Sequence, residues 1–183
     1  MYKHFFMLAF LSLAINLQAQ KYLTRNGNIT FHSETPLETI EAAHNQVTSV
    51  LDASNGQLAF SVLMKGFQFE KALMQEHFNE KYVESDKYPK ATFKGSIQNL
   101  DEIDFNTDGT YTAKVSGEMT MHGKTHPVET VGTLEIKDGK IVAKSEFDLA
   151  VADYDIKIPS VVRDNIAKVI HVKVQMQYAA YGG

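Results

Sequence analysis

Two histidines, His122 and His126, stand at a spacing that would place both on one face of a helix, where they could ligate a metal ion. Gly123 lies between them and Pro127 follows the second, so this segment is predicted to turn instead of forming a helix. No third ligand is evident beside them. We therefore predict no metal site, and we expect His122 at a hairpin corner to hydrogen-bond backbone groups that the turn leaves unpaired.

Acidic and nucleophilic residues are also present, but their spacing matches no catalytic motif. The chain has no G-x-S-x-G nucleophile elbow, no glycine-rich phosphate loop and no dinucleotide fingerprint. Glu76 and Glu80 share one face of a predicted helix, where a solvated surface is the simpler interpretation. Asp148, Asp153 and Asp155 lack the glycine and terminal glutamate of an EF-hand calcium loop. These residues predict neither an enzyme nor a cofactor.

Composition narrows the function classes further. The chain has 183 residues with 18 Lys and Arg against 22 Asp and Glu, a formal charge of -4, and 44% hydrophobic residues. The absence of cysteine excludes disulfides, cysteine-ligated metals, a thiol nucleophile and a lipid anchor on cysteine. The acidic balance argues against nucleic-acid binding, which needs a basic surface. Length and composition are typical of one folded domain.

The first twenty residues differ from the rest of the chain. They read MYKHFFMLAFLSLAINLQAQ, with a positive charge at Lys3, an apolar run and the small residue Ala19 at a cleavage position. This pattern is typical of a secretory signal peptide, and the apolar run is shorter than the ~20 residues of a membrane-spanning helix. We predict a signal peptide over residues 1–19 and a domain over residues 20–183, in the periplasm or secreted. No second long apolar segment follows, so we expect no stable membrane anchor after signal removal.

Period-two alternation dominates the remaining sequence and predicts half-buried strands. In residues 110–121, for example, Tyr111 and Ala113 fall on one face while Thr112 and Lys114 fall on the other. The same alternation marks residues 57–65, 91–97, 140–150 and 170–178, with weaker strands over residues 28–32, 46–52 and 125–137. We count eight antiparallel strands.

Dipeptides that favour tight turns separate these strands. They are Asn55-Gly56, Asp108-Gly109 and Asp138-Gly139, and residues 122–124 are predicted to turn the chain as well. Residues 69–82 have helical spacing instead, with no glycine or proline inside, and a second short helical turn is expected around residues 161–168. The sequence thus predicts one short helical insertion among the strands.

Long strands with one apolar face must bury that face in a sandwich or a closed barrel, and closure removes exposed edges. An eight-stranded barrel is about the size that either fills with side chains or holds one small ligand. The inward positions carry flexible methionines and small residues, which leave room for an irregular apolar ligand. These small residues are Ala91, Gly95, Ala113, Gly117, Gly132, Ala143 and Ser145. The alternative is that they compensate for large Phe and Tyr neighbours in a filled barrel.

Three stretches resemble the YceI-like family of secreted lipid-binding proteins. The most specific is VSGEMTMHGKTHPV at residues 115–128, which resembles the family's strand–turn–strand pattern G-x-L-T-x-H-G-x-T-x-P-V. Residues 84–95, ESDKYPKATFKG, are similar to the family's D-x-x-K-Y-P-x-x-x-F entry into a central strand. Residues 145–158 resemble its phenylalanine-centred strand and loop, and His77 stands where the family commonly has a histidine. The resemblance covers residues 56–178.

This resemblance implies a lipocalin-like antiparallel barrel with a short helical insertion. Family members are similar in holding a long apolar chain, an isoprenoid or an amide-type lipid, inside the barrel. The sequence departs from the family pattern at its start. There, a join over residues 33–45 between the first two predicted strands lacks the usual F-x-V-x-H run.

We therefore predict an all-β, eight-stranded antiparallel lipocalin-like β-barrel that sequesters or carries a polyisoprenoid or other lipid by burial, without catalysis. The inward-facing residues predicted to line the cavity are Phe60, Val62, Met64, Phe93, Tyr111, Val115, Met119, Met121, Leu134, Phe147, Val172, Val174 and Met176. Several of these are expected to plug the closed end. The alternatives are a filled barrel whose outer surface binds a partner or a second copy, and a hydrolase that uses His77 or His122. No nucleic acid, metal or cofactor is expected, and a homodimer is compatible with the prediction.

Overall fold

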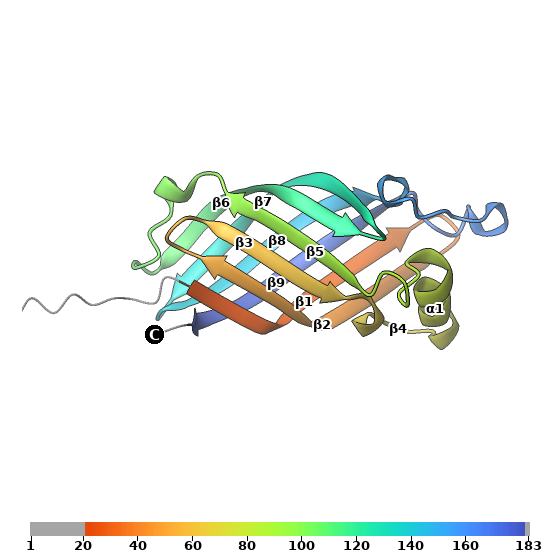
Figure 1. The fold of residues 1–183 in the computed structure, drawn as a ribbon, viewed down its shortest axis with the longest axis horizontal. Helices are drawn as coiled ribbons and strands as arrows, with labels where there is room; N and C mark the ends of the chain where they lie inside the picture. Colours follow the sequence, from red (N-terminus) through yellow and green to blue (C-terminus); the bar gives the residue numbers. More distant parts are fainter. Residues whose placement is uncertain (1–20, 182–183) are drawn as a thin grey trace, which may run out of the picture.

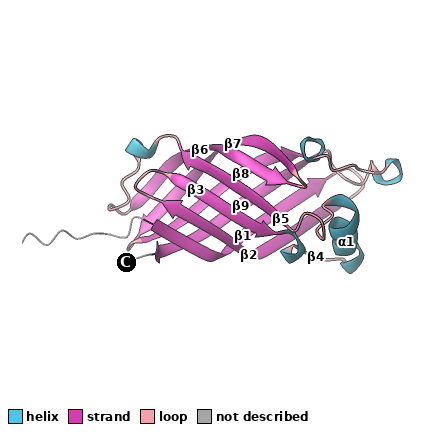
Figure 2. Cartoon of the chain, viewed as in Figure 1, coloured by secondary structure: helices cyan, strands magenta, loops and turns pink. Residues whose placement is uncertain are grey.

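Eight antiparallel strands close into a barrel in the computed structural model, which describes residues 21–181 (Figure 1, Figure 2). The barrel strands are β1 (Lys21–Glu34), β2 (Thr39–Asp52), β3 (Gln57–Leu63), β5 (Lys90–Ile97), β6 (Gly109–Met121), β7 (Lys124–Lys137), β8 (Lys140–Ala150) and β9 (Val169–Tyr181). They pair in the order β1–β2–β3–β5–β6–β7–β8–β9, and β9 pairs with β1 to complete the circle. The predicted eight-stranded barrel is confirmed. The signal peptide predicted over residues 1–19 lies outside the described residues.

The β6–β7 hairpin shows how alternation builds the wall of the barrel. Its register runs without a break from Gly109 opposite Ile136 to Met121 opposite Lys124. Inward Ala113 is buried, whereas the residues on either side of it are exposed. Each strand thus gives one face to the interior and the other to solvent.

Left-handed residues make the tight turns between neighbouring strands. His122 and Gly123, between β6 and β7, have φ of 50° and 73°, and Asp138 and Gly139, between β7 and β8, have φ of 50° and 70°. Two consecutive positive φ values give the turn whose twist matches that of the flanking strands. The turn between β2 and β3 likewise places Gly56 at a φ of 71°.

The turn predicted at Asp108-Gly109 is wrong. β5 reaches β6 through a longer loop with a 3₁₀ turn at Leu100–Glu102, and Gly109 begins β6 without a positive φ. The Asp108 carboxylate instead accepts a hydrogen bond from the backbone N–H of Asp138 at 3.1 Å. The dipeptide therefore connects the ends of two hairpins and does not form one.

The first two strands are much longer than predicted, with 14 residues each, and only residues 35–38 join them. The predicted join over residues 33–45 is therefore wrong. One cause is a bulge between Thr24 and Ile29, which shifts the phase of the buried positions and interrupts the period-two pattern. The second cause is that several buried residues of these strands are polar. They are Thr24, Ser33, His44 and Ser49.

The helical insertion is shorter than predicted and lies at one end of the barrel (Figure 1). In place of a helix over residues 69–82 the chain forms β4 (Gln68–Phe69), α1 (Ala72–His77) and a π-helical turn at Phe78–Tyr82. β4 pairs with β2, and this pairing removes Phe69 from the helix. The second predicted helical turn is a 3₁₀ turn at Ser160–Val162.

Side chains fill the barrel at the end where β9 finishes at Tyr181, which we call the closed end. Ile141 and Met176 are fully buried, and the Tyr178 hydroxyl donates a hydrogen bond to Ser49 Oγ at 2.6 Å. Ser49 Oγ in turn donates to the Ala59 carbonyl at 2.9 Å, so both buried hydroxyls have partners. Burial raises the pKa of Tyr178 and keeps its hydroxyl a neutral donor.

Candidate ligand-binding cavity

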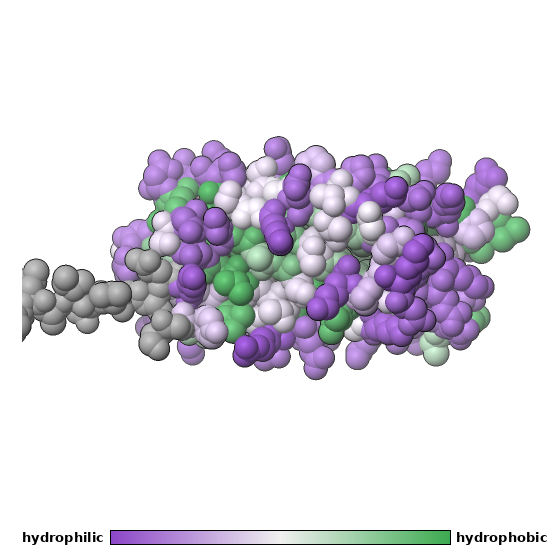
Figure 3. Space-filling view, viewed as in Figure 1, coloured by the Kyte–Doolittle hydropathy of each residue, from purple (hydrophilic) through white to green (hydrophobic). Residues whose placement is uncertain are grey.

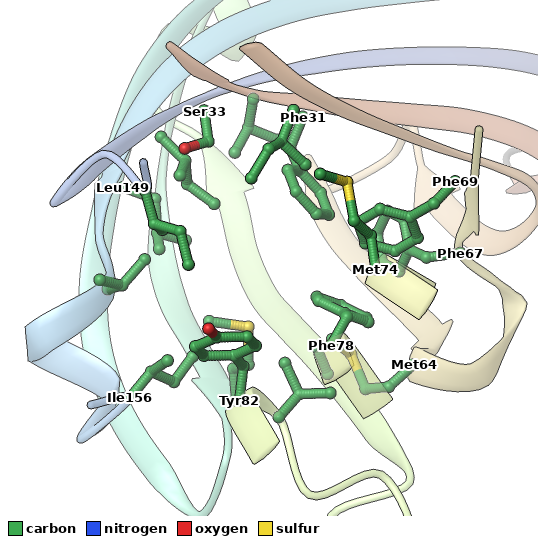
Figure 4. A pocket seen from close by; sticks show the side chains of 18 of the residues that line it. Phe31, Ser33, Met64, Phe67, Phe69, Met74, Phe78, Tyr82, Leu149 and Ile156 are labelled. Atoms are coloured by element: carbon green, nitrogen blue, oxygen red, sulfur yellow. The ribbon is translucent and has the colours of Figure 1, made fainter. Parts of the chain in front are cut away.

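An apolar cavity of about 380 Å³ occupies the other end of the barrel, which we call the open end. Strand residues such as Ile29, Val62 and Val172 form its wall, and residues of α1 and of segment 151–166 extend it beyond the strands. In Figure 4 the side chains of Phe31 and Tyr82, with others, surround one central space. The volume lies within the roughly 300–1,000 Å³ that is typical of small-molecule sites.

Four phenylalanines form a continuous cluster along one side of the cavity. Phe31 of β1 lies 5.3, 5.8 and 5.6 Å, between ring centroids, from Phe67, Phe69 and Phe78. Phe78 also contacts Phe67 at 5.6 Å and Phe69 at 5.1 Å. Tilted and edge-on contacts at these distances are the favourable arrangements for aromatic pairs. The cluster therefore fixes the helical insertion to the barrel wall and gives the cavity a preformed side.

The structure places seven of the thirteen predicted lining residues at this cavity. They are Val62, Met64, Met119, Met121, Phe147, Val172 and Val174. Another four, Phe60, Val115, Leu134 and Met176, border a separate void of about 50 Å³ toward the closed end, and Val174 borders both spaces. The predicted set thus runs along the barrel interior from the open end into the packed half.

The remaining two predicted residues, Phe93 and Tyr111, border neither space. The Phe93 ring lies against Phe60, with 6.0 Å between centroids, and the Tyr111 hydroxyl donates to the Thr107 carbonyl at 3.0 Å. Tyr111 is therefore held at the β5–β6 loop instead of facing a cavity.

The small inward residues do not mark the large cavity. Only Ala91 borders it, whereas Ala113, Gly132, Ala143 and Ser145 border the void of about 50 Å³. The end of the Phe93 ring occupies the space into which a Cβ on Gly95 or Gly117 would project, 2.6 Å away in both cases. These glycines therefore accommodate a large neighbour, as the filled-barrel alternative expected of small inward residues.

Much of the lining comes from segments whose periodicity was not informative. These residues include Phe31 and Ser33 of β1, Phe67, Met74, Phe78 and Tyr82 in and beside the insertion, and Ile156, Ile158 and Val162 in the segment after β8. Sequence reasoning missed them because it assigned lining only to regular strands. For the residues after β8, the signal that could have found them is the repeated apolar residues of segment 151–162, which lie outside any predicted strand.

One carboxylate, Glu38, connects the three segments around the opening of the cavity. Its Oε1 pairs with Lys71 Nζ at 3.3 Å, beside α1, and its Oε2 accepts a hydrogen bond from Asn165 Nδ2 at 3.3 Å. Nearby, Ser33 Oγ accepts the backbone N–H of Ala167 at 2.8 Å. These bonds hold the β1–β2 turn, the insertion and segment 160–167 in one arrangement.

Few polar groups face the cavity, and none of those from the described residues is a lysine or arginine. The polar lining residues are Ser33, Glu38, His77, Tyr82 and Asn165. Burial raises the pKa of Tyr82, so its hydroxyl is a neutral donor and acceptor. The cavity can thus bury an apolar chain and hydrogen-bond an uncharged group, but it offers no cation to a carboxylate or phosphate.

His122 fastens the β6–β7 turn to two loops of the open end. Its Nδ1 lies 2.8 Å from the Tyr154 carbonyl oxygen and its Nε2 lies 2.7 Å from the Glu84 carboxylate, both at hydrogen-bond distance, and the side chain is only 9% exposed. The Tyr88 ring packs edge-on against the imidazole at 4.7 Å. The predicted bond from this histidine to the backbone is present, but its partner is the Tyr154 carbonyl of another loop and not a group of the turn itself. His126 lies instead against the Tyr154 ring, and within residues 21–181 no three acidic or histidine side chains gather as a metal site.

A closed antiparallel barrel with a preformed apolar cavity at one end has the architecture of the lipocalin-like barrels, which can hold one small ligand. Residues 21–178 match the model of the YceI-like domain, and the chain therefore belongs to the YceI-like family. Among curated proteins, none matches this chain.

Solved structures share the fold at low sequence identity. A polyisoprenoid binding domain from Saccharophagus degradans superposes with a TM-score of 0.78 at 12% identity, over 90% of this chain and 100% of that one. Burkholderia cenocepacia BcnA has a TM-score of 0.64 at 13% identity, over 84% and 96% of the two chains. The Campylobacter jejuni YceI protein has a TM-score of 0.59 at 14% identity, over 78% and 85%. Within residues 21–181, no helix has the length and apolar character needed to cross a bilayer.

Proposed function

We propose that this protein binds and carries a lipid with a long apolar chain, of the polyisoprenoid type, in the open end of its barrel. The cavity carries this proposal, because about 380 Å³ of space is lined mainly by aliphatic, aromatic and methionine side chains. Membership of the YceI-like family and the likeness to a polyisoprenoid binding domain support it. A filled barrel, the alternative from the sequence, does not account for this space.

Burial alone supplies the affinity for such a ligand. Each methylene moved from water into an apolar cavity contributes about 0.8 kcal/mol, or about fourfold in Kd. Four methionines, Met64, Met74, Met119 and Met121, border the space and can adapt to an irregular chain. The site therefore needs no catalytic group and no rigid match to one ligand shape.

We further propose that the ligand ends in an uncharged head group near the opening. Tyr82 offers a neutral hydroxyl, and the amide of Asn165 also borders the cavity. Glu38 would repel an anionic head group, and no lysine or arginine of the described chain faces the space to offset that repulsion. An alcohol, phenol, quinone or amide end is therefore favoured over a free acid or a phosphate.

The protein is proposed to be non-catalytic. Both ring nitrogens of His122 are engaged by acceptors, so neither is free to take a proton from a substrate. In the described chain, the histidines that pair with carboxylates are His32, His122 and His171, and His77 lacks such a partner. The proposed location is the periplasm or the exterior, from the signal peptide predicted over residues 1–19, and a homodimer stays a prediction.

Titration with a homologous series of straight-chain primary alcohols tests the proposed function. We expect Kd to fall about fourfold per added methylene until the cavity is full, and then to level off. Carboxylic acids of the same lengths serve as matched controls and should bind more weakly at neutral pH. An affinity that does not depend on chain length, or a preference for the acids, would contradict the proposal.

A further inference from the structure

Three exposed aliphatic side chains stand around the opening of the cavity. Leu37 is 68% exposed in the β1–β2 turn, Leu73 is 59% exposed on α1, and Val161 is 88% exposed in the 3₁₀ turn at Ser160–Val162. We call these three residues the apolar tips. In Figure 1 the segments that carry them lie together at the open end, and in Figure 3 hydrophobic surface shows at that end. Exposed aliphatic groups gathered in one place mark an interaction surface more strongly than the same groups scattered singly.

Each apolar tip has a sequence neighbour that lines the cavity. Glu38, Met74 and Val162 border the space, and Leu37, Leu73 and Val161 immediately precede them and face outward. The same three segments therefore form the inner wall of the opening and its outer rim. Because Glu38 bonds to Lys71 and Asn165, the tips are held at the rim together and do not belong to three independent loops.

A bilayer surface fits these tips better than a second protein does. Single aliphatic side chains on separate protruding loops can each enter the boundary between headgroups and acyl chains. Three such side chains supply only part of the roughly 800 Å² that each partner buries in a stable protein complex. Lys71 and Arg163, each two residues from a tip, are exposed and can place their charges at headgroup level while their stems stay apolar.

The charge around the opening does not select anionic lipids. Lys71 and Arg163 have acidic neighbours in Glu70 and Asp164, and Lys71 is already paired with Glu38. Attachment by the apolar tips is therefore expected on uncharged membranes as well, with weak dependence on salt.

We propose that the open end attaches to lipid bilayers through Leu37, Leu73 and Val161, so that an apolar chain passes between membrane and cavity without crossing water. This inference rests on the proposed function, which provides the apolar ligand. With the tips in the bilayer, the opening faces the acyl region. A chain that enters directly does not expose its methylenes to water. Each methylene placed in water would lower the equilibrium constant for transfer by about fourfold.

Flotation of the protein with phosphatidylcholine vesicles tests the attachment. The triple variant Leu37→Ser, Leu73→Ser, Val161→Ser should lose at least about tenfold in vesicle partitioning. The matched control is Val131→Ser, which removes an aliphatic side chain that is 62% exposed on β7, away from the opening. It should float as the unmodified protein does.

Binding of a pyrene-labelled long-chain alcohol in vesicle-free solution separates this inference from the proposed function. The triple variant should bind this probe with unchanged Kd, because the tips do not line the cavity, yet take it from labelled vesicles at least about tenfold more slowly. Probe binding by a protein that never floats with vesicles overturns the membrane attachment and leaves the carrier function standing. A dimer that the triple substitution abolishes, without vesicle binding, would also overturn it and assign the tips to a second copy. No probe binding at all refutes the carrier function itself.

Discussion

Replacing His122 by asparagine tests how the open end is held together. The substitution removes the bond to the Tyr154 carbonyl and the charge-assisted bond to Glu84. A neutral hydrogen bond contributes about 0.5–1.5 kcal/mol and a bond to a charged group about 1.5–3 kcal/mol. Because Glu84 is 44% exposed and partly screened, we expect a loss of about 2–3 kcal/mol in the free energy of unfolding.

Asparagine is the appropriate replacement because residue 122 has a φ of 50°. Asparagine tolerates this left-handed conformation, so the measured loss reports the lost bonds and not backbone strain. Urea unfolding followed by circular dichroism measures the free energy, and the expected loss corresponds to a fall in Tm of about 5–10 °C. Asp138→Asn, at the other left-handed turn position with a φ of 50°, is the matched control and should change little. If both variants unfold alike, the interpretation of His122 as a fastening between loops is wrong.

Three further predictions concern the interior. Ser49→Ala should lower the free energy of unfolding by about 1–3 kcal/mol, measured in urea, because it leaves the buried Tyr178 hydroxyl without a partner. Tyr178→Phe should lower the free energy of unfolding by less. Equal or reversed losses would contradict the bond assignment. Burial lowers the pKa of His44 below 6.5, so the unfolded chain takes up a proton first as the pH falls, and the free energy of unfolding declines below about pH 6.5. His44→Gln should flatten this pH dependence of stability. An unchanged pH profile would contradict the assignment of the dependence to His44. Met121→Trp should reduce alcohol binding by filling the cavity while the protein stays folded, whereas Val131→Trp on the outer face should not; uptake that survives Met121→Trp removes this residue from the lining.

The regular half of the barrel could be predicted from the sequence because its physical cause is local. Residues 140–150 were predicted as a strand and form β8 over the same span. Alternation survives there because one face packs in the barrel interior, whereas the other carries charged side chains at the surface, such as Glu146 and Asp148. Strands β1 and β2 were predicted only in part, over residues 28–32 and 46–52, because a bulge shifts their phase and because residues such as Ser33 and His44 put polar atoms on the buried face.

The position of the cavity depends on contacts between segments far apart in the sequence. Small residues such as Ala113 predicted free space beside them. The space that Ala113 borders is only a void of about 50 Å³, because side chains from other strands fill the closed half of the barrel. The larger space exists because Phe67, Phe78 and the segment after β8 extend the wall beyond the strand ends. The hydrophobic pattern of a single segment cannot predict this extension of the wall, because it is formed by segments that are far apart in the sequence.

Mass spectrometry of the organic extract of natively purified protein tests the central claim most directly. We expect an uncharged lipid with a long apolar chain at close to one molecule per protein. The matched sample is Met121→Trp, which should yield much less of the same lipid. A folded protein that repeatedly yields no lipid, or yields the same amount whether or not the cavity is filled, would contradict the carrier function.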